Sequence, residues 1–215
     1  MPSAGRHPYK TAPDSQEIAA RAPLRPEAVA IRRPARPAAP GLTPMLLVRH
    51  AQSEWNLHFS RSRIDPGIPD PDLTAEGVRQ AGELAAELGR HDLVRLVCSP
   101  YRRALRTASI VAGALGLPLT VEPLVRERCA FSCDQGTPAA DLARDWPDLD
   151  FAHLPEIWWG GLIESHDSLA ARCDAFRAAA TAMPDRDRVA VISHWGFIRC
   201  LTGQAVDNTV IVRLA

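Results

Sequence analysis

Residues 45–56 constrain the fold of this chain more than any other stretch of its sequence. A run of four apolar residues, from Met45 to Val48, is followed at once by the polar pair Arg49 and His50. Such a run is typical of a parallel strand that is covered on both faces, and these strands present ligand groups at their carboxyl ends. The pattern therefore predicts a buried strand that delivers an arginine and a histidine to one edge of a sheet.

These two side chains are suited to phosphoryl chemistry. The guanidinium of Arg49 offers paired donors for phosphate oxygens, and the imidazole of His50 has a free nitrogen near neutral pH that can attack phosphorus. An isolated Arg-His pair is more often a solvated surface feature than a catalytic one. Further motifs along the chain are needed to distinguish a catalytic pair from a solvated surface pair.

Strand-like runs recur along the chain and alternate with helical patterns. Two of these strands are also followed by a helix start, where backbone amides form a natural site for an anion. Arg103 lies in the helix expected to begin at Ser99-Pro100, and His194 directly follows the other strand. This alternation predicts a doubly wound α/β domain, with a mostly parallel sheet and helices on both faces. The further predicted strands are residues 93–98, 119–121, 189–192 and 209–214.

Two amphipathic helices are expected between the strands. Thr74 is predicted to cap the first, which Gly89 ends, and Asp167 to cap the second. Before the first helix, residues 59–73 are rich in proline and are expected to be irregular. The side chains expected to face inward are Val78, Ala81, Leu84, Ala85 and Leu88 in the first helix, and Leu169, Cys173, Phe176, Ala180 and Met183 in the second.

The chain is expected to hold one folded domain, residues 45–215, preceded by an extension. Residues 1–44 contain nine of the nineteen prolines, separated mainly by Ala and Arg, and are predicted to be disordered. Within the domain, residues 137–165 combine tryptophans with prolines and acids and are interpreted as a capping insertion. Aromatic packing is the favoured role for these tryptophans, and substrate contact is the alternative.

Charge and cysteine content narrow the function classes. Residues 45–215 carry eighteen basic against twenty-two acidic side chains, which gives no electrostatic basis for nucleic-acid binding. The five cysteines include no CxxC pair, so neither a disulfide framework nor a metal site is predicted. Apolar runs are too short to span a bilayer. We expect a cytoplasmic protein that needs no membrane.

Several motifs in order resemble those of one family. Residues 49–56 read Arg-His-Ala-Gln-Ser-Glu-Trp-Asn, which resembles the signature of the histidine phosphatase superfamily, a group that includes the cofactor-dependent phosphoglycerate mutases. The Arg-Ala-x-x-Thr-Ala motif at Arg103, the acid Glu127 after the third predicted strand, and Ser-His-x-Gly at His194 match further family segments. The resemblance extends from residue 45 to about residue 214, and the ordered set is far more specific than any single motif.

The resemblance implies a role for each matching side chain. His50 would attack phosphorus, Glu127 would donate a proton to the leaving oxygen, and His194 would be the second catalytic histidine. Arg49 and Arg103 would bind the phosphate, and Asn56 would add a hydrogen bond to it. The expected activity is hydrolysis of a small phosphorylated metabolite through a phosphohistidine, with neither metal nor cofactor.

Two other functions remain open from the sequence. A phosphoglycerate mutase would use the same pocket, although the chain has no lysine after Lys10 and lacks the long basic insertion that mutases use to grip a carboxylate. A non-catalytic module that binds a phosphorylated ligand is the second alternative, because motifs can persist without activity. The substrate itself is left undetermined, because the loop of residues 59–73 and the insertion of residues 137–165, which would select it, carry no clear pattern. Residues 128–136 also depart from the usual family pattern, which leaves the lid of the site open.

Overall fold

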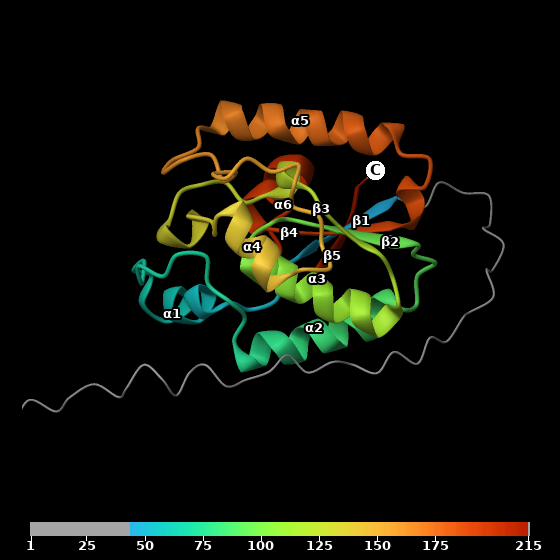
Figure 1. The fold of residues 1–215 in the computed structure, drawn as a ribbon, viewed down its shortest axis with the longest axis horizontal. Helices are drawn as coiled ribbons and strands as arrows, with labels where there is room; N and C mark the ends of the chain where they lie inside the picture. Colours follow the sequence, from blue (N-terminus) through green and yellow to red (C-terminus); the bar gives the residue numbers. More distant parts are fainter. Residues whose placement is uncertain (1–43, 215) are drawn as a thin grey trace, which may run out of the picture.

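The computed structural model describes residues 44–214, which form a five-stranded sheet with helices on both faces (Figure 1). Four strands run parallel, and the last is antiparallel to the first. The predicted doubly wound α/β fold is thus confirmed, whereas the predicted extension lies outside the described residues except for Pro44. In spatial order the strands are β3 (Leu119–Val121), β2 (Arg95–Cys98), β4 (Val189–Ser193), β1 (Met45–Arg49) and β5 (Ile211–Leu214).

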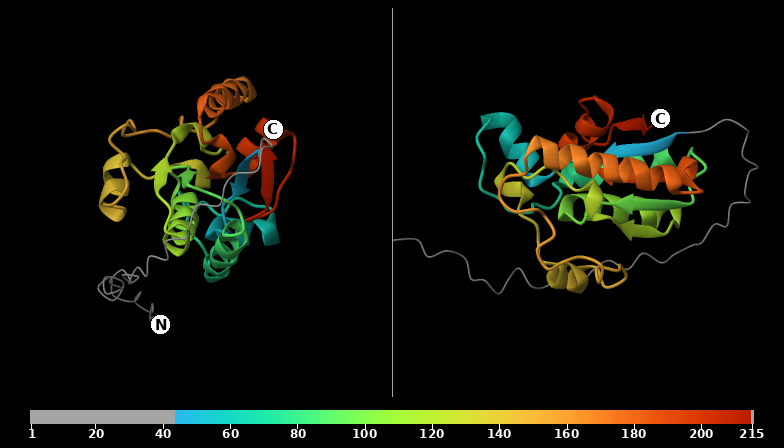
Figure 2. Two further views of the ribbon diagram at one scale, coloured as in Figure 1. Left: turned by 90° about the vertical axis from the view of Figure 1, so that its right-hand side faces the viewer. Right: turned by 90° about the horizontal axis from the view of Figure 1, so that it is seen from above.

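The helices form a layer on each face of the sheet. Helices α2 (Ala75–Leu88) and α3 (Arg102–Leu115) cover one face, and α5 (His166–Ala182) and α6 (Trp195–Thr202) cover the other (Figure 1). Helix α1 (Glu54–Ser62) follows β1, and α4 (Ala139–Asp145) lies at the periphery in both views of Figure 2. Short 3-10 turns occupy Pro123–Val125, Ser132–Asp134 and Arg186–Arg188.

Two separate apolar cores arise from the alternation of side chains along the strands. In β1, Leu46 and Val48 pack in the cluster that holds the inner residues of α2 and α3. Met45 and Leu47 point the other way, into the cluster that holds those of α5 and α6. Because β1, β2 and β4 are apolar on both faces, these central strands are buried between the two layers of helices.

The predicted inner face of α2 needs one correction. Thr74 caps the helix as predicted, since its hydroxyl accepts a hydrogen bond from the amide of Gly77 (2.9 Å). Val78, however, is 42% exposed, and Gly77 is buried in its place. A Cβ atom at Gly77 would lie 2.1 Å from the carbonyl oxygen of Gln52. This close approach of backbone to backbone requires glycine there and turns Val78 toward solvent.

Several helix boundaries also differ from the predicted ones. Helix α1 continues to Ser62, so residues 59–62 are helical rather than irregular. Helix α3 begins at Arg102, two residues beyond the Pro100 that was expected in its first turn. Helix α5 is capped by Ser165, whose hydroxyl accepts from the amide of Ser168 (3.1 Å), and not by Asp167, which lies inside the first turn. At α5 the hydroxyl of Ser165 caps the helix in place of the predicted carboxylate, whereas the other two boundaries differ by two to four residues.

The segment between α1 and α2 is fastened to the turn at Ser132. The carboxylate of Asp65 accepts hydrogen bonds from the indole of Trp55 (3.0 Å) and from the amides of Gly67 (3.0 Å) and Ser132 (2.8 Å). Although burial would raise it, a hydrogen bond from the hydroxyl of Ser132, together with the three above, holds the pKa of Asp65 at about 2. The ring of Phe131 lies 5.1 Å from that of Trp55. Two loops that are distant in sequence therefore form one wall beside the ends of the strands.

The segment interpreted as a capping insertion packs on the start of α3. Trp158 is 4% exposed, its indole donates to the carbonyl of Thr137 (2.9 Å), and its ring meets Tyr101 edge-on at 4.7 Å. Trp146 lies 5.0 Å from the guanidinium of Arg102. These contacts support the packing role for the tryptophans. Within residues 44–214, no helix is both long and apolar enough to cross a membrane.

Candidate active site

Polar side chains from three strand ends meet at one edge of the sheet. His50 follows β1 and His194 follows β4, and the amide of His50 donates to the carbonyl of Ser193 (2.9 Å). The two imidazole rings lie 5.0 Å apart, centroid to centroid. Arg103, in the first turn of the helix after β2, is near enough for its charge to lower the pKa of both histidines. The strands thus bring together the predicted groups.

His50 is held with one particular ring nitrogen available. The imidazole is buried, and its Nδ1 lies 2.7 Å from the carbonyl oxygen of Ala51. A carbonyl oxygen only accepts, so Nδ1 carries the proton and Nε2 keeps its lone pair. Burial, followed by the charges of Arg103 and Arg49, lowers the pKa of His50 well below its ordinary value of 6.5. His50 is therefore a neutral and oriented base.

His194 is fully buried and keeps both ring nitrogens free. Neither nitrogen has a hydrogen-bond partner among residues 44–214, although a buried imidazole normally has one. The ring packs against Tyr101, with centroids 5.2 Å apart. Burial and then the charge of Arg103 lower its pKa well below 6.5. An unsatisfied neutral imidazole beside His50 is available to hydrogen-bond a ligand oxygen.

Arg103 is the most enclosed cation of the site. It is 3% exposed, and its two terminal nitrogens donate to the carbonyl of Cys133 (2.7 Å) and the carboxylate of Asp134 (3.1 Å). A second buried carboxylate, Asp70, lies 3.9 Å away. The guanidinium carbon of Arg103 lies 4.4 Å from the centre of the Tyr101 ring. The guanidinium is thus fixed by both loops of the wall and brings its positive charge close to the histidines.

Asp70 also explains why arginines are tolerated at the start of α3. Positive side chains are unfavourable at the positive end of a helix unless an anion offsets them. That anion is the carboxylate of Asp70, which accepts from the amide of Arg102 (3.0 Å) and from that of Thr137 (2.9 Å). Burial raises the pKa of Asp70, against the opposing charge of Arg103.

Arg49 and Asn56 border the site on the side of β1. One terminal nitrogen of Arg49 donates to the carbonyl of Val206 (3.0 Å), while its buried Nε has no partner within the described chain. The Oδ1 atom of Asn56 accepts from the amide of Ser53 (3.2 Å) and from the amide nitrogen of Asn208 (3.3 Å). Asn56 is thus primarily a capping residue of α1, and the hydrogen bonds made by its oxygen leave its NH₂ group for a ligand.

Glu127 lies at the start of α6, next to His194. Its carboxylate accepts from the amides of Arg128 (2.8 Å), Gly196 (3.0 Å) and Phe197 (3.2 Å). A Cβ at position 196 would stand 2.4 Å from Oε1, so glycine is needed for this contact. Burial, followed by the charge of Asp134, raises the pKa of Glu127. A buried carboxyl with a raised pKa is suited to donating a proton.

Four residues that the sequence did not single out complete the arrangement. Asp70 and Asp134 hold Arg103, and Asn208 donates to the carbonyl of His50 (2.8 Å). Thr107 joins both sides, since its hydroxyl accepts from the amide of Ala51 (3.1 Å) and donates to the carbonyl of Arg103 (2.7 Å). Thr107 stands in the Arg-Ala-x-x-Thr-Ala motif and could have been found; the other three lie in segments without a periodic pattern.

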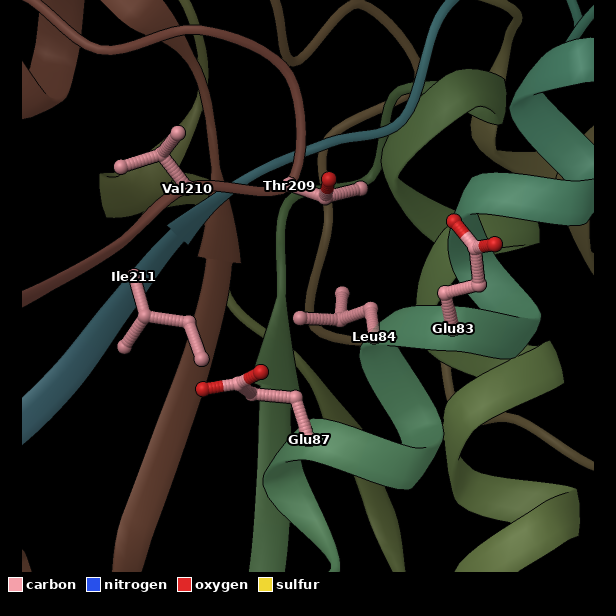
Figure 3. A pocket seen from close by; sticks show the side chains of 6 residues that line it. All are labelled: Glu83, Leu84, Glu87, Thr209, Val210 and Ile211. Atoms are coloured by element: carbon pink, nitrogen blue, oxygen red, sulfur yellow. The ribbon is translucent and has the colours of Figure 1, made fainter.

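Metal binding and a second pocket are separate from this cluster of side chains. Within residues 44–214, no three His, Cys, Asp or Glu side chains gather in a way that could hold a metal ion. A pocket of about 340 Å³ lies between α2 and β5, and Figure 3 shows that two glutamates project toward it. It includes none of the predicted site residues, so we assign it no part in the chemistry. Its lining residues are Glu83, Leu84, Glu87, Thr209, Val210 and Ile211.

The lowered histidine pKa values predict how stability depends on pH. A histidine with a pKa below 6.5 in the folded state binds protons preferentially when unfolded, so stability is lost as pH falls below 6.5. Between pH 7.5 and 5.5 each buried imidazole should cost about 1.4 kcal/mol of unfolding free energy. In denaturant unfolding, the unfolding free energy of His194→Gln should therefore fall by about 1.4 kcal/mol less than that of wild type between pH 7.5 and 5.5. Equal losses would show that His194 titrates normally.

Comparisons with known proteins identify the family of this chain. A family model described as histidine phosphatase superfamily (branch 1) matches residues 45–210. A probable phosphoglycerate mutase GpmB of Proteus mirabilis is 30% identical over 166 residues, which are 72% of this chain and 71% of that protein. Phosphoserine phosphatase 1 of Hydrogenobacter thermophilus is 41% identical over 83 residues, which are 39% of this chain and 37% of that protein.

Solved structures share the fold. A mycobacterial glucosyl-3-phosphoglycerate phosphatase, crystallised with VO3, superposes with a TM-score of 0.57 at 23% identity, covering 79% of this chain and 89% of that one. At this identity the likeness concerns the arrangement of strands and helices alone. The order of the motifs, the family model and the fold point the same way.

Proposed function

The chain belongs to the histidine phosphatase superfamily, and we propose that it hydrolyses a small phosphomonoester through a phosphohistidine formed on His50. The observation that carries this proposal is the state of His50. It is buried and neutral, and its Nδ1 proton is engaged by the Ala51 carbonyl, so that Nε2 is free to attack. A nucleophile needs an activated lone pair in a fixed direction, and this imidazole has one.

The first step is in-line attack of Nε2 on phosphorus. The N–P bond forms as the bond between phosphorus and the leaving oxygen breaks, and Glu127 gives its proton to that oxygen. Arg49, Arg103 and His194 hold the other three phosphoryl oxygens and stabilise their charge. The raised pKa of Glu127, caused by burial and by the charge of Asp134, keeps a proton available for this transfer.

In the second step water replaces the alcohol. Glu127, now a carboxylate, accepts a proton from the water as its oxygen attacks phosphorus, and the N–P bond breaks to release phosphate and the neutral imidazole. Two arginines already supply the positive charge that the phosphoryl oxygens require, so we expect catalysis without a metal or another cofactor. Asn56 adds a hydrogen bond to the phosphate through its NH₂ group.

The proposed partner is a small phosphorylated metabolite. Two of the similar proteins are named as phosphatases of such compounds, one of phosphoserine and one of glucosyl-3-phosphoglycerate. The five free cysteines support a reducing location such as the cytoplasm. The described domain has more acidic than basic side chains, which supports no role in binding nucleic acid.

A mutase activity is the second candidate, because similar proteins such as that of Proteus mirabilis are described as probable phosphoglycerate mutases. Both reactions use His50, Arg49, Arg103 and His194, and they differ in what accepts the phosphoryl group. The chain has no lysine after Lys10 to bind a second anionic group of the substrate. We therefore favour water as the acceptor.

Phosphate release from a panel of phosphomonoesters tests this choice. We expect metabolites in the panel to release inorganic phosphate at a rate that neither chelators nor 2,3-bisphosphoglycerate changes. Interconversion of 3- and 2-phosphoglycerate that is faster than phosphate release would establish the mutase instead. Binding of phosphate without any turnover or phosphohistidine would establish a non-catalytic module.

A further inference from the structure

Arg172, on α5, is buried and uses every donor that it has. Its side chain is 5% exposed, and each of its five N–H groups has an acceptor. The motifs that indicated the active site do not include this residue. Each donor of a buried arginine that lacked an acceptor would cost free energy. The complete set of acceptors therefore indicates that this side chain has a structural role.

The acceptors of Arg172 are concentrated on the segment that carries Glu127. One terminal nitrogen donates to the carbonyls of Leu124 (2.8 Å) and Arg126 (2.7 Å). The other donates to the carbonyl of Glu127 itself (3.4 Å). One planar guanidinium therefore fixes three carbonyls within four consecutive residues, which leaves the backbone of the acid little freedom to rotate.

Glu164 fixes the guanidinium from the other side. Its carboxylate accepts from Nε (3.1 Å) and from Nη2 (2.5 Å) of Arg172 in a bidentate pair. It also accepts from Arg126 (3.2 Å) and from the hydroxyl of Ser168 (3.2 Å). Burial alone would raise the pKa of Glu164, but the hydrogen bonds and charge of Arg172 lower it. The pair is thus ionised and rigid.

Glu127 is consequently held at both ends. Arg172 fixes its backbone from α5, while the amides of Gly196 and Phe197 fix its carboxylate from α6. A displacement of about 1 Å at such a group can cost a hundredfold in rate. We propose that Arg172, with Glu164, is the positioning residue of the proton-donating acid; this inference rests on the function proposed above.

Leaving-group dependence distinguishes positioning from general support of the fold. An alkyl phosphate leaves as a strongly basic alkoxide and needs the proton of Glu127, whereas p-nitrophenyl phosphate leaves as a weakly basic phenolate and does not. Phosphoenzyme formation in a single turnover should be measured with both. We expect Arg172→Lys to slow the reaction of glycerol 2-phosphate by about 100-fold and that of p-nitrophenyl phosphate by about threefold or less.

Lysine is the informative substitute because it keeps the positive partner of Glu164 but lacks the planar fork that spans three carbonyls. If that variant fails to fold, the charge-free pair Arg172→Met with Glu164→Met should fold and show the same selective loss. Arg177→Met is the matched control: Arg177 lies on the same helix and also donates to a backbone carbonyl, that of Leu201 (2.6 Å). It should slow both substrates alike.

A double-mutant cycle completes the test. In a Glu127→Gln background, Arg172→Lys should lose its selective effect on glycerol 2-phosphate, because no proton donor remains to be positioned. Equal losses on both substrates in wild-type background, or full additivity with Glu127→Gln, would overturn the inference while leaving the phosphatase proposal intact. Absence of phosphohistidine in wild type with every substrate would overturn the proposed function, and the inference with it.

Discussion

His50→Ala should form no acid-labile phosphoprotein and should lose more than about 10⁴-fold in turnover, because removal of a nucleophile abolishes the covalent route. The imidazole is buried without an ion pair, so its removal should cost only about 1–3 kcal/mol of stability and leave a folded protein. Labelling with a radioactive phosphomonoester, followed by acid treatment, measures the phosphoprotein directly.

His58→Ala is the matched control for this experiment, because His58 is an exposed histidine of α1. It should retain both labelling and turnover. A phosphohistidine that still forms in the folded His50→Ala protein would place the nucleophile elsewhere and reject the mechanism.

Arg103→Met should reduce both activity and stability. Loss of the phosphate-binding charge should lower kcat/KM by at least about 100-fold, as expected when a donor to a charged transition state is removed. Asp134 and Asp70 would remain buried without their cation, and breaking such a buried pair costs about 3–5 kcal/mol. Steady-state kinetics and denaturant unfolding measure the two effects.

A second substitution separates the two contributions of Arg103. Asp134→Asn in the Arg103→Met background removes one of the two unpaired charges and should recover part of the stability without recovering activity. Arg102→Met serves as the control, since Arg102 is a partly exposed neighbour that pairs with Asp145. Retained phosphate affinity in a folded Arg103→Met protein would contradict the assignment of Arg103.

The strand ends were the predictable part of this site. An apolar run that stops at a polar pair predicts a strand buried on both faces that ends at the edge of a sheet. Arg49 is the last residue of β1, His50 and His194 directly follow β1 and β4, and Arg103 lies in the first turn of the helix after β2. Their convergence follows from parallel strands sharing one carboxyl-end edge.

The partners of Arg103 were not predictable in the same way. Asp70 lies in a loop and Asp134 in a single 3-10 turn, both far from Arg103 in the sequence, and no periodicity indicates that their carboxylates turn inward. The same limit applies to Val78, which fits the helical period but is displaced by the contact of Gly77 with the Gln52 carbonyl. Tertiary contacts of this kind override local patterns because their energy depends on a neighbour that the pattern does not contain.

The place of Glu127 at the start of α6 has a consequence for the energetics of the reaction cycle. In the proposed first step this group changes from a neutral acid to an anion, and burial opposes that change. The amides of Gly196 and Phe197, at the positive end of the helix, are already aligned toward the charge that appears. In the proposed mechanism these two amides would solvate the spent carboxylate in place of water, and the same hydrogen bonds would limit how strongly that carboxylate can act as a base afterwards.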